Sequence, residues 1–212
     1  MTDRLVIASV QATRAAGADI AVFPELFLCG YPPEDLAMKP AAIAACAAAA
    51  ERLAKATEGG PAVLIGTLWP SLTGRPYNAV ALLADGHVAG VTFKRELPTY
   101  GVFDEHRVFA RGDLPKPFEW RGVRLGVPVC EDIWLPEVTA HLQAGGAELL
   151  LVPNGSPFRV SAIGERCAVA QARVEETGLP LLYVNQVGGQ DELVFEGGSF
   201  AVQADGEVCM SL

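Results

Sequence analysis

The sequence repeats itself once, at an interval of about 120 to 130 residues. Four pairs of similar segments occur in the same order: 4–10 with 124–130, 17–25 with 146–154, 61–65 with 180–184, and 84–86 with 204–206. Each similarity is weak alone, but four in one order indicate two similar halves. The fold must therefore contain one arrangement of strands and helices twice.

Each half is predicted to contain two strands, a helix, a third strand and a hairpin. Four continuous apolar runs are typical of strands buried on both faces: 20–23, 63–65, 149–152 and 181–184. Good helix formers predict helices at 41–57 and 166–177. The Asp-Gly pairs at 85–86 and 205–206 indicate hairpin turns. We therefore predict an α/β fold, a four-layer α-β-β-α sandwich made of two repeated halves.

The two halves differ after their first strands. Gly146 comes 16 residues after Cys130, which leaves room for a short helix over 136–144. Gly17 comes only 7 residues after Val10. Since a crossover between parallel strands needs about a dozen residues, we expect the first half to lack one early helix, and the first strand and its connection to differ accordingly.

The charge balance argues against two classes of partner. Lys and Arg number 16 and Asp and Glu 25, which gives a net charge of −9 at pH 7. A surface of this sign repels phosphate backbones and anionic lipids, so we expect neither a nucleic acid nor a membrane partner. No apolar run approaches the about 18 residues of a membrane span, and no secretory leader is visible. The five cysteines form no disulfide or zinc pattern, and a reducing cytoplasm is the expected location.

Cys130 ends an apolar run and is followed at once by Glu131 and Asp132. Free cysteines are mostly buried core residues, so residue type alone favours a core thiol over a nucleophile. A nucleophilic thiol needs a base or a cation beside it. Of the three histidines, His87 and His141 fall in a predicted strand and a predicted helix, and none lies in a motif. A Cys-His protease is therefore poorly supported, although His106 stays open as an alternative base.

Two other residues offer better partners for the thiol. Glu25 follows the apolar run 20–24, and Lys94 follows the predicted strand 87–93, so both lie where a strand ends. Each alone would more often be a solvated residue at a strand exit. Together with Cys130, however, they supply a carboxylate that can take the thiol proton and an ammonium that can stabilise an oxyanion.

Three short motifs around these residues resemble the nitrilase, or carbon–nitrogen hydrolase, superfamily: FPEL at 23–26, FKRELP at 93–98 and VCEDIW at 129–134. The α-β-β-α sandwich is also the fold of that superfamily. Three further segments narrow the resemblance to the amidase domain of glutamine-dependent NAD⁺ synthetases: GYPPEDL at 30–36, YGVFDE at 100–105 and VGGQDELVF at 187–195. The resemblance covers nearly the whole chain.

The resemblance implies that this domain, residues 1–212, hydrolyses glutamine to glutamate and ammonia through a cysteine thioester. Glu25 would be the general base and Cys130 the nucleophile, while Lys94 and the backbone N–H after the cysteine would hold the oxyanion. Glu105 would position the lysine and the substrate. Tyr100 and Ser156 match positions that line the glutamine pocket, and for both of them a loop-packing role is about equally expected.

The resemblance also implies partners that this sequence does not supply. In the family a downstream ligase domain uses the ammonia, with ATP, Mg²⁺ and deamido-NAD⁺, to make NAD⁺. No phosphate-binding glycine loop of that kind occurs before Leu212, so we expect a fragment, a truncated form or a decayed copy, without a cofactor or metal of its own. Assembly into a homo-oligomer is also implied. The alternatives are a free-standing amidase acting on another amide and an inactive assembly domain.

Overall fold

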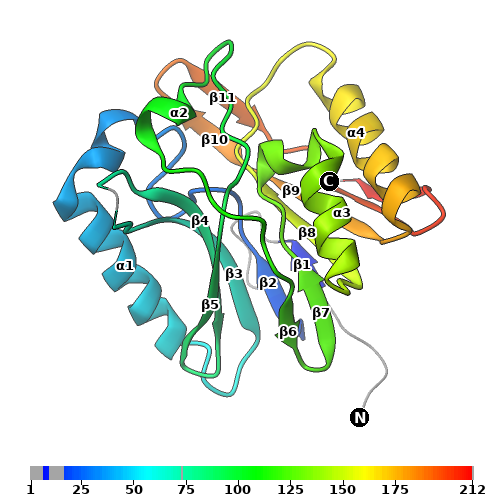
Figure 1. The fold of residues 1–212 in the computed structure, drawn as a ribbon, viewed down its shortest axis with the longest axis horizontal. Helices are drawn as coiled ribbons and strands as arrows, with labels where there is room; N and C mark the ends of the chain where they lie inside the picture. Colours follow the sequence, from blue (N-terminus) through cyan, green and yellow to red (C-terminus); the bar gives the residue numbers. More distant parts are fainter. Residues whose placement is uncertain (1–6, 10–16, 73, 212) are drawn as a thin grey trace.

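The computed structural model describes residues 7–9, 17–72 and 74–211. Two β-sheets lie face to face, with helices on the outer side of each (Figure 1). The first half contains β1 (Ile7–Ser9), β2 (Ile20–Val22), the 3₁₀ helix η1 (Glu34–Met38), α1 (Pro40–Lys55), β3 (Ala62–Trp69), β4 (Tyr77–Ala84) and β5 (His87–Phe93). After the short helix α2 (Glu105–Val108), the second half contains β6 (Phe118–Trp120), β7 (Val123–Gly126), the 3₁₀ helix η2 (Cys130–Ile133), α3 (Pro136–Ala144), β8 (Leu149–Asn154), α4 (Ala162–Thr177), β9 (Leu181–Asn185), β10 (Val187–Gln190), β11 (Leu193–Glu196), β12 (Phe200–Val202) and β13 (Val208–Ser211).

The topology of the two sheets confirms the repeat seen in the sequence. The first sheet has the strand order β1-β2-β3-β4-β5, and the second has β13-β12-β9-β8-β7-β6. In the first sheet β1, β2 and β3 are parallel, and β4 and β5 continue it in antiparallel pairs. The strands β7, β8, β9, β12 and β13 follow the same scheme. Among the strands of the described residues, only β6, which pairs with β7 in an antiparallel hairpin, extends the second sheet beyond the first.

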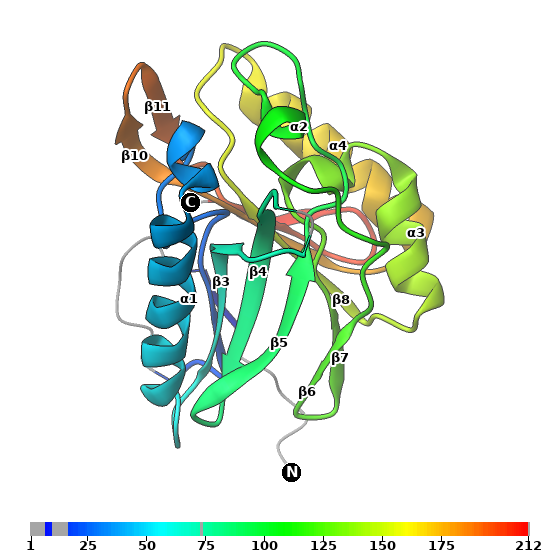
Figure 2. The same ribbon diagram turned by 60° about the vertical axis from the view of Figure 1, so that its left-hand side comes forward.

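The hydrophobic core lies between the two sheets and between each sheet and the helices on its outer face. Leu64 of β3 and Leu151 of β8 belong to one buried cluster that joins the inner faces of the two sheets. The next residue along β3, Ile65, packs with α1, and Leu150 of β8 packs with α3 and α4. Figure 2 shows α1 on one outer face and α3 and α4 on the other. The predicted four-layer sandwich is confirmed, and the strands β2, β3, β8 and β9 contain the predicted continuous apolar runs because both of their faces are buried.

The strand that precedes Cys130, β7, ends earlier than the sequence predicted. We expected a strand over 124–130 with Cys130 at its end, but β7 ends at Gly126, which pairs with Leu150 of β8. Pro128 has no N–H group and cannot continue the ladder. Cys130 is instead the first residue of η2, so a tight 3₁₀ turn, rather than a strand end, presents the thiol.

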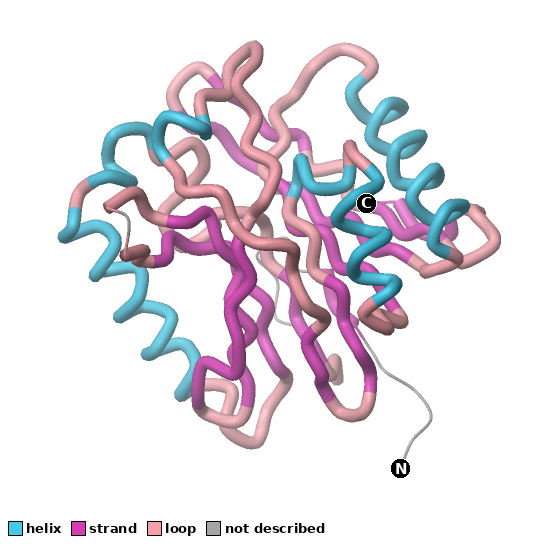
Figure 3. Tube along the Cα trace, viewed as in Figure 1, coloured by secondary structure: helices cyan, strands magenta, loops and turns pink. Residues whose placement is uncertain are grey.

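The helices agree closely with the prediction, and Figure 3 shows their positions along the chain. The helix α3 has the predicted bounds, α1 covers most of the predicted 41–57, and α4 begins one turn before the predicted 166. The hairpin β10–β11 was not predicted, because 187–190 is rich in glycine and lacks apolar alternation. The expected absence of an early helix concerns residues 10–16, which lie outside the described residues, but β1 is present and pairs in parallel with β2.

Candidate active site

Glu25 lies just beyond β2 and is fully buried. Its Oε1 accepts hydrogen bonds from Lys94 Nζ and Asn78 Nδ2, both at 2.7 Å. Its Oε2 accepts a hydrogen bond from the backbone N–H of Gly155, at 2.9 Å. The ammonium, amide and backbone donors orient the carboxylate and compensate for the loss of water around it.

Lys94 directly follows β5 and is also fully buried. Its Nζ lies 2.7 Å from Glu25 Oε1 and 2.9 Å from Glu105 Oε1. Burial lowers the pKa of Lys94, but the carboxylates of Glu105 and Glu25 outweigh it and raise this pKa well above its ordinary value. The lysine is therefore a cation, held between two carboxylates at the ends of elements that are far apart in the sequence.

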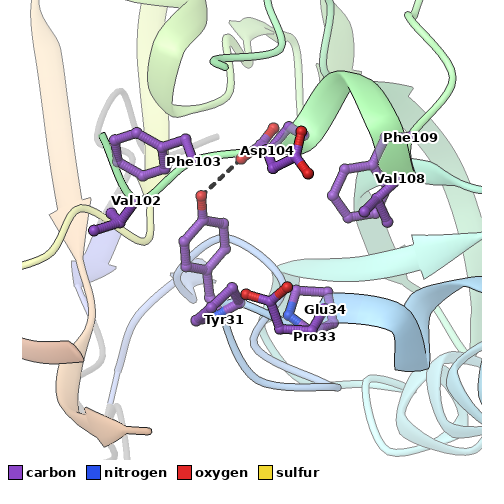
Figure 4. Close-up of a pocket in the computed structure, with 10 residues that line it drawn as sticks. Tyr31, Pro33, Glu34, Val102, Phe103, Asp104, Val108 and Phe109 are labelled. Atoms are coloured by element: carbon purple, nitrogen blue, oxygen red, sulfur yellow. Dashed lines mark hydrogen bonds between the residues drawn. The ribbon is translucent and has the colours of Figure 1, made fainter. Parts of the chain in front are cut away.

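Glu105 begins α2, and the hydroxyl of Tyr31 donates a hydrogen bond of 2.8 Å to its Oε1. Figure 4 shows this contact, with the Tyr31 ring between Pro33 on one side and Phe103 on the other. Burial raises the pKa of Glu105 to about 7, although Lys94 lowers it. The cavity drawn in Figure 4 measures only about 30 Å³, which is room for one or two water molecules rather than a substrate.

Cys130 is 6% exposed, and its backbone has a φ of 48°. A positive φ is unusual for a residue with a side chain and indicates a strained turn that its surroundings hold in place. Burial raises the pKa of the Cys130 thiol well above its ordinary value, Glu25 raises it further, and Lys94 lowers it. The charges of Glu25, Lys94 and Glu105 all act on this thiol, so the structure brings the four predicted catalytic residues together.

A second cavity, of about 600 Å³, lies next to the thiol. Cys130, Tyr100 and Ser156 all line it, as the sequence predicted for the last two, and so do Glu131 and Trp134. The hydroxyl of Tyr100 donates to the Glu131 carboxylate, with its oxygen 2.9 Å from each carboxylate oxygen. Cavities of this size accommodate small molecules. Glu25 and Lys94 are fully buried and are not among the residues that line the cavity.

Sequence reasoning missed three residues that hold this site. Asn78, which binds Glu25, stands in the otherwise apolar strand β4, and that isolated amide was the available signal. Tyr31, which binds Glu105, lies inside the GYPPEDL segment but was given no role. Arg166 of α4 is 2% exposed, and its Nε donates to Ser156 Oγ at 3.1 Å while its Nη1 pairs with Glu196 Oε1 at 2.8 Å. No pattern in the sequence pointed to this buried arginine.

Other candidate chemistries receive no support from the described part of the chain. His87, His106 and His141 are all exposed, on a hairpin strand and two helices, whereas Cys130 is buried. Among the described residues no group of three or more His, Cys, Asp or Glu side chains is arranged to hold a metal ion. No helix within residues 7–9, 17–72 and 74–211 has the length and apolarity to cross a membrane.

The chain is similar in sequence to known proteins. The glutamine-dependent NAD(+) synthetase of Rhodobacter capsulatus is 49% identical over 206 residues, which are 97% of this chain and 37% of that protein. The chain thus spans well under half the length of this curated relative.

Two solved structures share the fold. The glutamine-dependent NAD⁺ synthetase of Acinetobacter baumannii, in complex with ADP, superposes with a TM-score of 0.86 at 37% identity, over 92% of this chain and 37% of that one. A mutant of the amidase of Nesterenkonia sp. AN1 carries the acetamide moiety of fluoroacetamide on its active-site cysteine. It has a TM-score of 0.80 at 30% identity, over 92% of this chain and 73% of that one. The family model for carbon-nitrogen hydrolases matches residues 1–212, and the chain belongs to that family.

Proposed function

We propose that this chain hydrolyses the side-chain amide of glutamine to glutamate and ammonia, with Cys130 as the nucleophile. The observation that carries the proposal is a buried thiol at the wall of a cavity of about 600 Å³, under the charges of a carboxylate and an ammonium that contact each other at 2.7 Å. The similarity to glutamine-dependent NAD(+) synthetases supports glutamine as the substrate.

In the first half of the reaction, the Glu25 carboxylate takes the proton of the Cys130 thiol. The sulfur attacks the amide carbon, and the oxyanion that forms is held by the Lys94 ammonium and the backbone N–H of Glu131. The carbon–nitrogen bond then breaks, Glu25 returns the proton to the leaving nitrogen, and ammonia departs. A γ-glutamyl thioester remains on Cys130.

In the second half, water replaces ammonia as the reacting partner. Glu25 takes a proton from the water while the water oxygen attacks the thioester carbon. The Lys94 ammonium and the backbone N–H of Glu131 hold the second oxyanion as they held the first. The carbon–sulfur bond breaks, the proton returns to the sulfur, and glutamate leaves. In this scheme Glu105 holds Lys94 in place through the 2.9 Å contact to its ammonium.

The cavity carries charges that suit an α-amino acid. Glu131 and Arg159 both line it, so a glutamine whose amide reaches Cys130 would find a carboxylate for its α-ammonium and a guanidinium for its α-carboxylate. Tyr100 and Ser156 add hydroxyl groups to the same wall. We propose that these two residues contact the substrate rather than only packing their loops.

We further propose that the ammonia feeds the synthesis of NAD⁺ from deamido-NAD⁺ in a ligase domain. The name of the relative from Rhodobacter capsulatus supports this role, since the chain matches only 37% of it. ATP, Mg²⁺ and deamido-NAD⁺ would act in that domain. The amide hydrolysis itself uses side chains and backbone groups of this domain, with no cofactor. Assembly into a homo-oligomer belongs to the same proposal.

Ammonia release from glutamine tests the proposal. The wild-type chain is expected to release ammonia from glutamine faster than from asparagine or acetamide, and Cys130→Ala and Glu25→Gln are expected to reduce the rate to background while the circular dichroism spectrum is retained. Cys209→Ala, which removes an exposed thiol, is the matched control. Hydrolysis of other amides but not of glutamine would favour a free-standing amidase, and no hydrolysis of any amide would favour an assembly domain.

A further inference from the structure

Asp132 is a fully buried carboxylate whose hydrogen-bond partners are backbone N–H groups from two separate segments. Its Oδ1 accepts from the N–H of Arg95 at 3.1 Å and of Glu96 at 2.8 Å. Its Oδ2 accepts from the N–H of Val129 at 2.9 Å. One side chain thus connects the segment after β5 with the turn that begins η2.

The contact with Val129 closes the turn around the nucleophile. The backbone N–H of Asp132 also donates to the carbonyl oxygen of Val129, at 3.0 Å, so Val129 and Asp132 are joined in both directions. Between them lie Cys130, with its positive φ of 48°, and Glu131, whose N–H is the proposed oxyanion donor. This reciprocal pair fixes the strained backbone that presents the sulfur.

The contacts with Arg95 and Glu96 fix the lysine in the same way. These residues follow Lys94 directly, and the backbone N–H of Lys94 itself donates to the carbonyl oxygen of Asn78 at 2.8 Å. Backbone on both sides of the Lys94 side chain is therefore held, by β4 before it and by Asp132 after it. A shift of Asp132 would move the lysine and the nucleophile turn relative to each other.

We propose that Asp132 is a positioning residue that sets the distance and direction between the Cys130 sulfur and the Lys94 ammonium. The proposal concerns how the cation promotes thiolate formation, and for turnover it rests on the proposed glutamine hydrolysis. Asparagine has nearly the same shape as aspartate but only one acceptor oxygen. In Asp132→Asn, either Val129 or the pair Arg95 and Glu96 would face an NH₂ group instead of an oxygen.

The test measures thiolate formation separately from glutamine turnover. Iodoacetamide alkylates a thiolate, with a carbon–sulfur bond formed, the carbon–iodine bond broken and iodide released, and peptide mass spectrometry reads each cysteine. In Asp132→Asn we expect alkylation of Cys130 to slow at least about tenfold at pH 7.5, with its pH profile displaced upward. The kcat for glutamine is expected to fall about tenfold to a hundredfold with little change in KM.

The controls separate positioning from loss of structure. Asp205→Asn makes the same substitution in an exposed turn, where Asp205 Oδ1 accepts the N–H of Glu207 at 3.0 Å, and should change nothing. Cys46, buried against the first sheet, reports unfolding and should stay protected. Cys167, a half-buried thiol in α4, serves as a second control. An unchanged alkylation rate and pH profile at Cys130, or equal changes at Cys46 and Cys167, would overturn the proposal. If Asp132→Asn does not fold, Asp132→Glu, which keeps the charge but displaces it, should show the same slower alkylation.

The alkylation result stands even where the proposed function does not. A wild-type chain that releases no ammonia from glutamine would contradict the proposed function, while slower Cys130 alkylation in Asp132→Asn would still support the positioning role. Normal glutamine turnover in the wild type with wild-type alkylation in Asp132→Asn would contradict the positioning role alone.

Discussion

The turns that follow β2 and β8 are corresponding parts of the two halves, but they are held by different means. The first turn, residues 23–26, lies directly against the backbone of β3. A Cβ atom added to Gly66 would stand 2.2 Å from Leu26 N and 2.4 Å from Pro24 O. The second turn, residues 155–156, is held by hydrogen bonds to a side chain of β9 instead of by direct backbone packing. Asn185 Oδ1 accepts from Ser156 N–H at 2.9 Å, and Asn185 Nδ2 donates to Ser156 O at 3.0 Å.

The difference shows how one repeated scaffold supplies two functions. The first turn, which presents Glu25, the proposed base, is fixed by its close packing against the backbone of β3. Asn154, the residue that corresponds to Glu25 in the repeat, donates to the carbonyl oxygen of Val152 in its own strand, at 2.6 Å. The second turn instead places Ser156 on the wall of the cavity. The hydrogen bond from Gly155 N–H to Glu25 joins the two turns.

Gly66→Ala breaks the first turn and should have the largest effect. The added methyl group would overlap backbone atoms of Pro24 and Leu26, so the turn must move and Glu25 with it. We expect kcat to fall about a hundredfold or more and the free energy of unfolding to decrease by about 3 kcal/mol. Gly164→Ala, at an uncrowded position in α4, is the control and should leave both quantities nearly unchanged. Wild-type activity in Gly66→Ala would show that the close packing does not hold Glu25.

Asn185→Ala breaks the second turn and should affect binding more than chemistry. It removes the acceptor of Ser156 N–H, one of the two donors to Ser156 O, and a donor to the carbonyl oxygen of Gly197, which lies 2.8 Å from Asn185 Nδ2. Arg166 Nη2, 3.1 Å from Ser156 O, remains as its other donor. We expect the free energy of unfolding to decrease by about 2 kcal/mol and KM for glutamine to rise about tenfold, with a smaller change in kcat. Steady-state kinetics and urea unfolding measure the two effects. A fall in kcat as large as that of Gly66→Ala would mean that the turns are not divided between binding and chemistry.

The positions of the functional residues at strand ends could largely be predicted from the sequence. The apolar runs placed Glu25 and Lys94 at strand exits, and the repeat paired Glu25 with Asn154, because strand ends depend on local pattern. The contacts that orient these residues depend on packing between segments that are far apart, as with Asn78 and Glu25, 53 positions away. No local pattern encodes such a contact. The turn at Cys130 has a local cause instead, because Pro128, two residues earlier, cannot continue the strand.

Tyr31→Phe sharpens the comparison, because Tyr31 contacts both the second turn and the carboxylate of Glu105. Its ring packs against Gly155, where an added Cβ would lie 2.9 Å from Tyr31 Cγ, and its hydroxyl binds Glu105. Burial holds the pKa of Glu105 at about 7, and the hydrogen bond from Tyr31 lowers it. Without the hydroxyl this pKa rises, so Glu105 loses its charge at a higher pH. The acid limb of the activity profile should move up by about half a unit to one unit, with activity at pH 8.5 reduced only a few-fold. An unmoved acid limb would show that Glu105 does not set it.

Arg121→Ala should have the smallest effect, although Arg121 also connects the two halves. Its guanidinium, in the turn between β6 and β7, pairs with Asp19 just before β2. The arginine side chain is 50% exposed and Asp19 is 25% exposed, so water and salt screen the pair. We expect the free energy of unfolding to decrease by less than about 1 kcal/mol, with no change in kcat or KM, and the difference from wild type to shrink as salt is added. A loss as large as that of Asn185→Ala would mean that surface charge, rather than the packing between the sheets and the buried turns, holds the halves together.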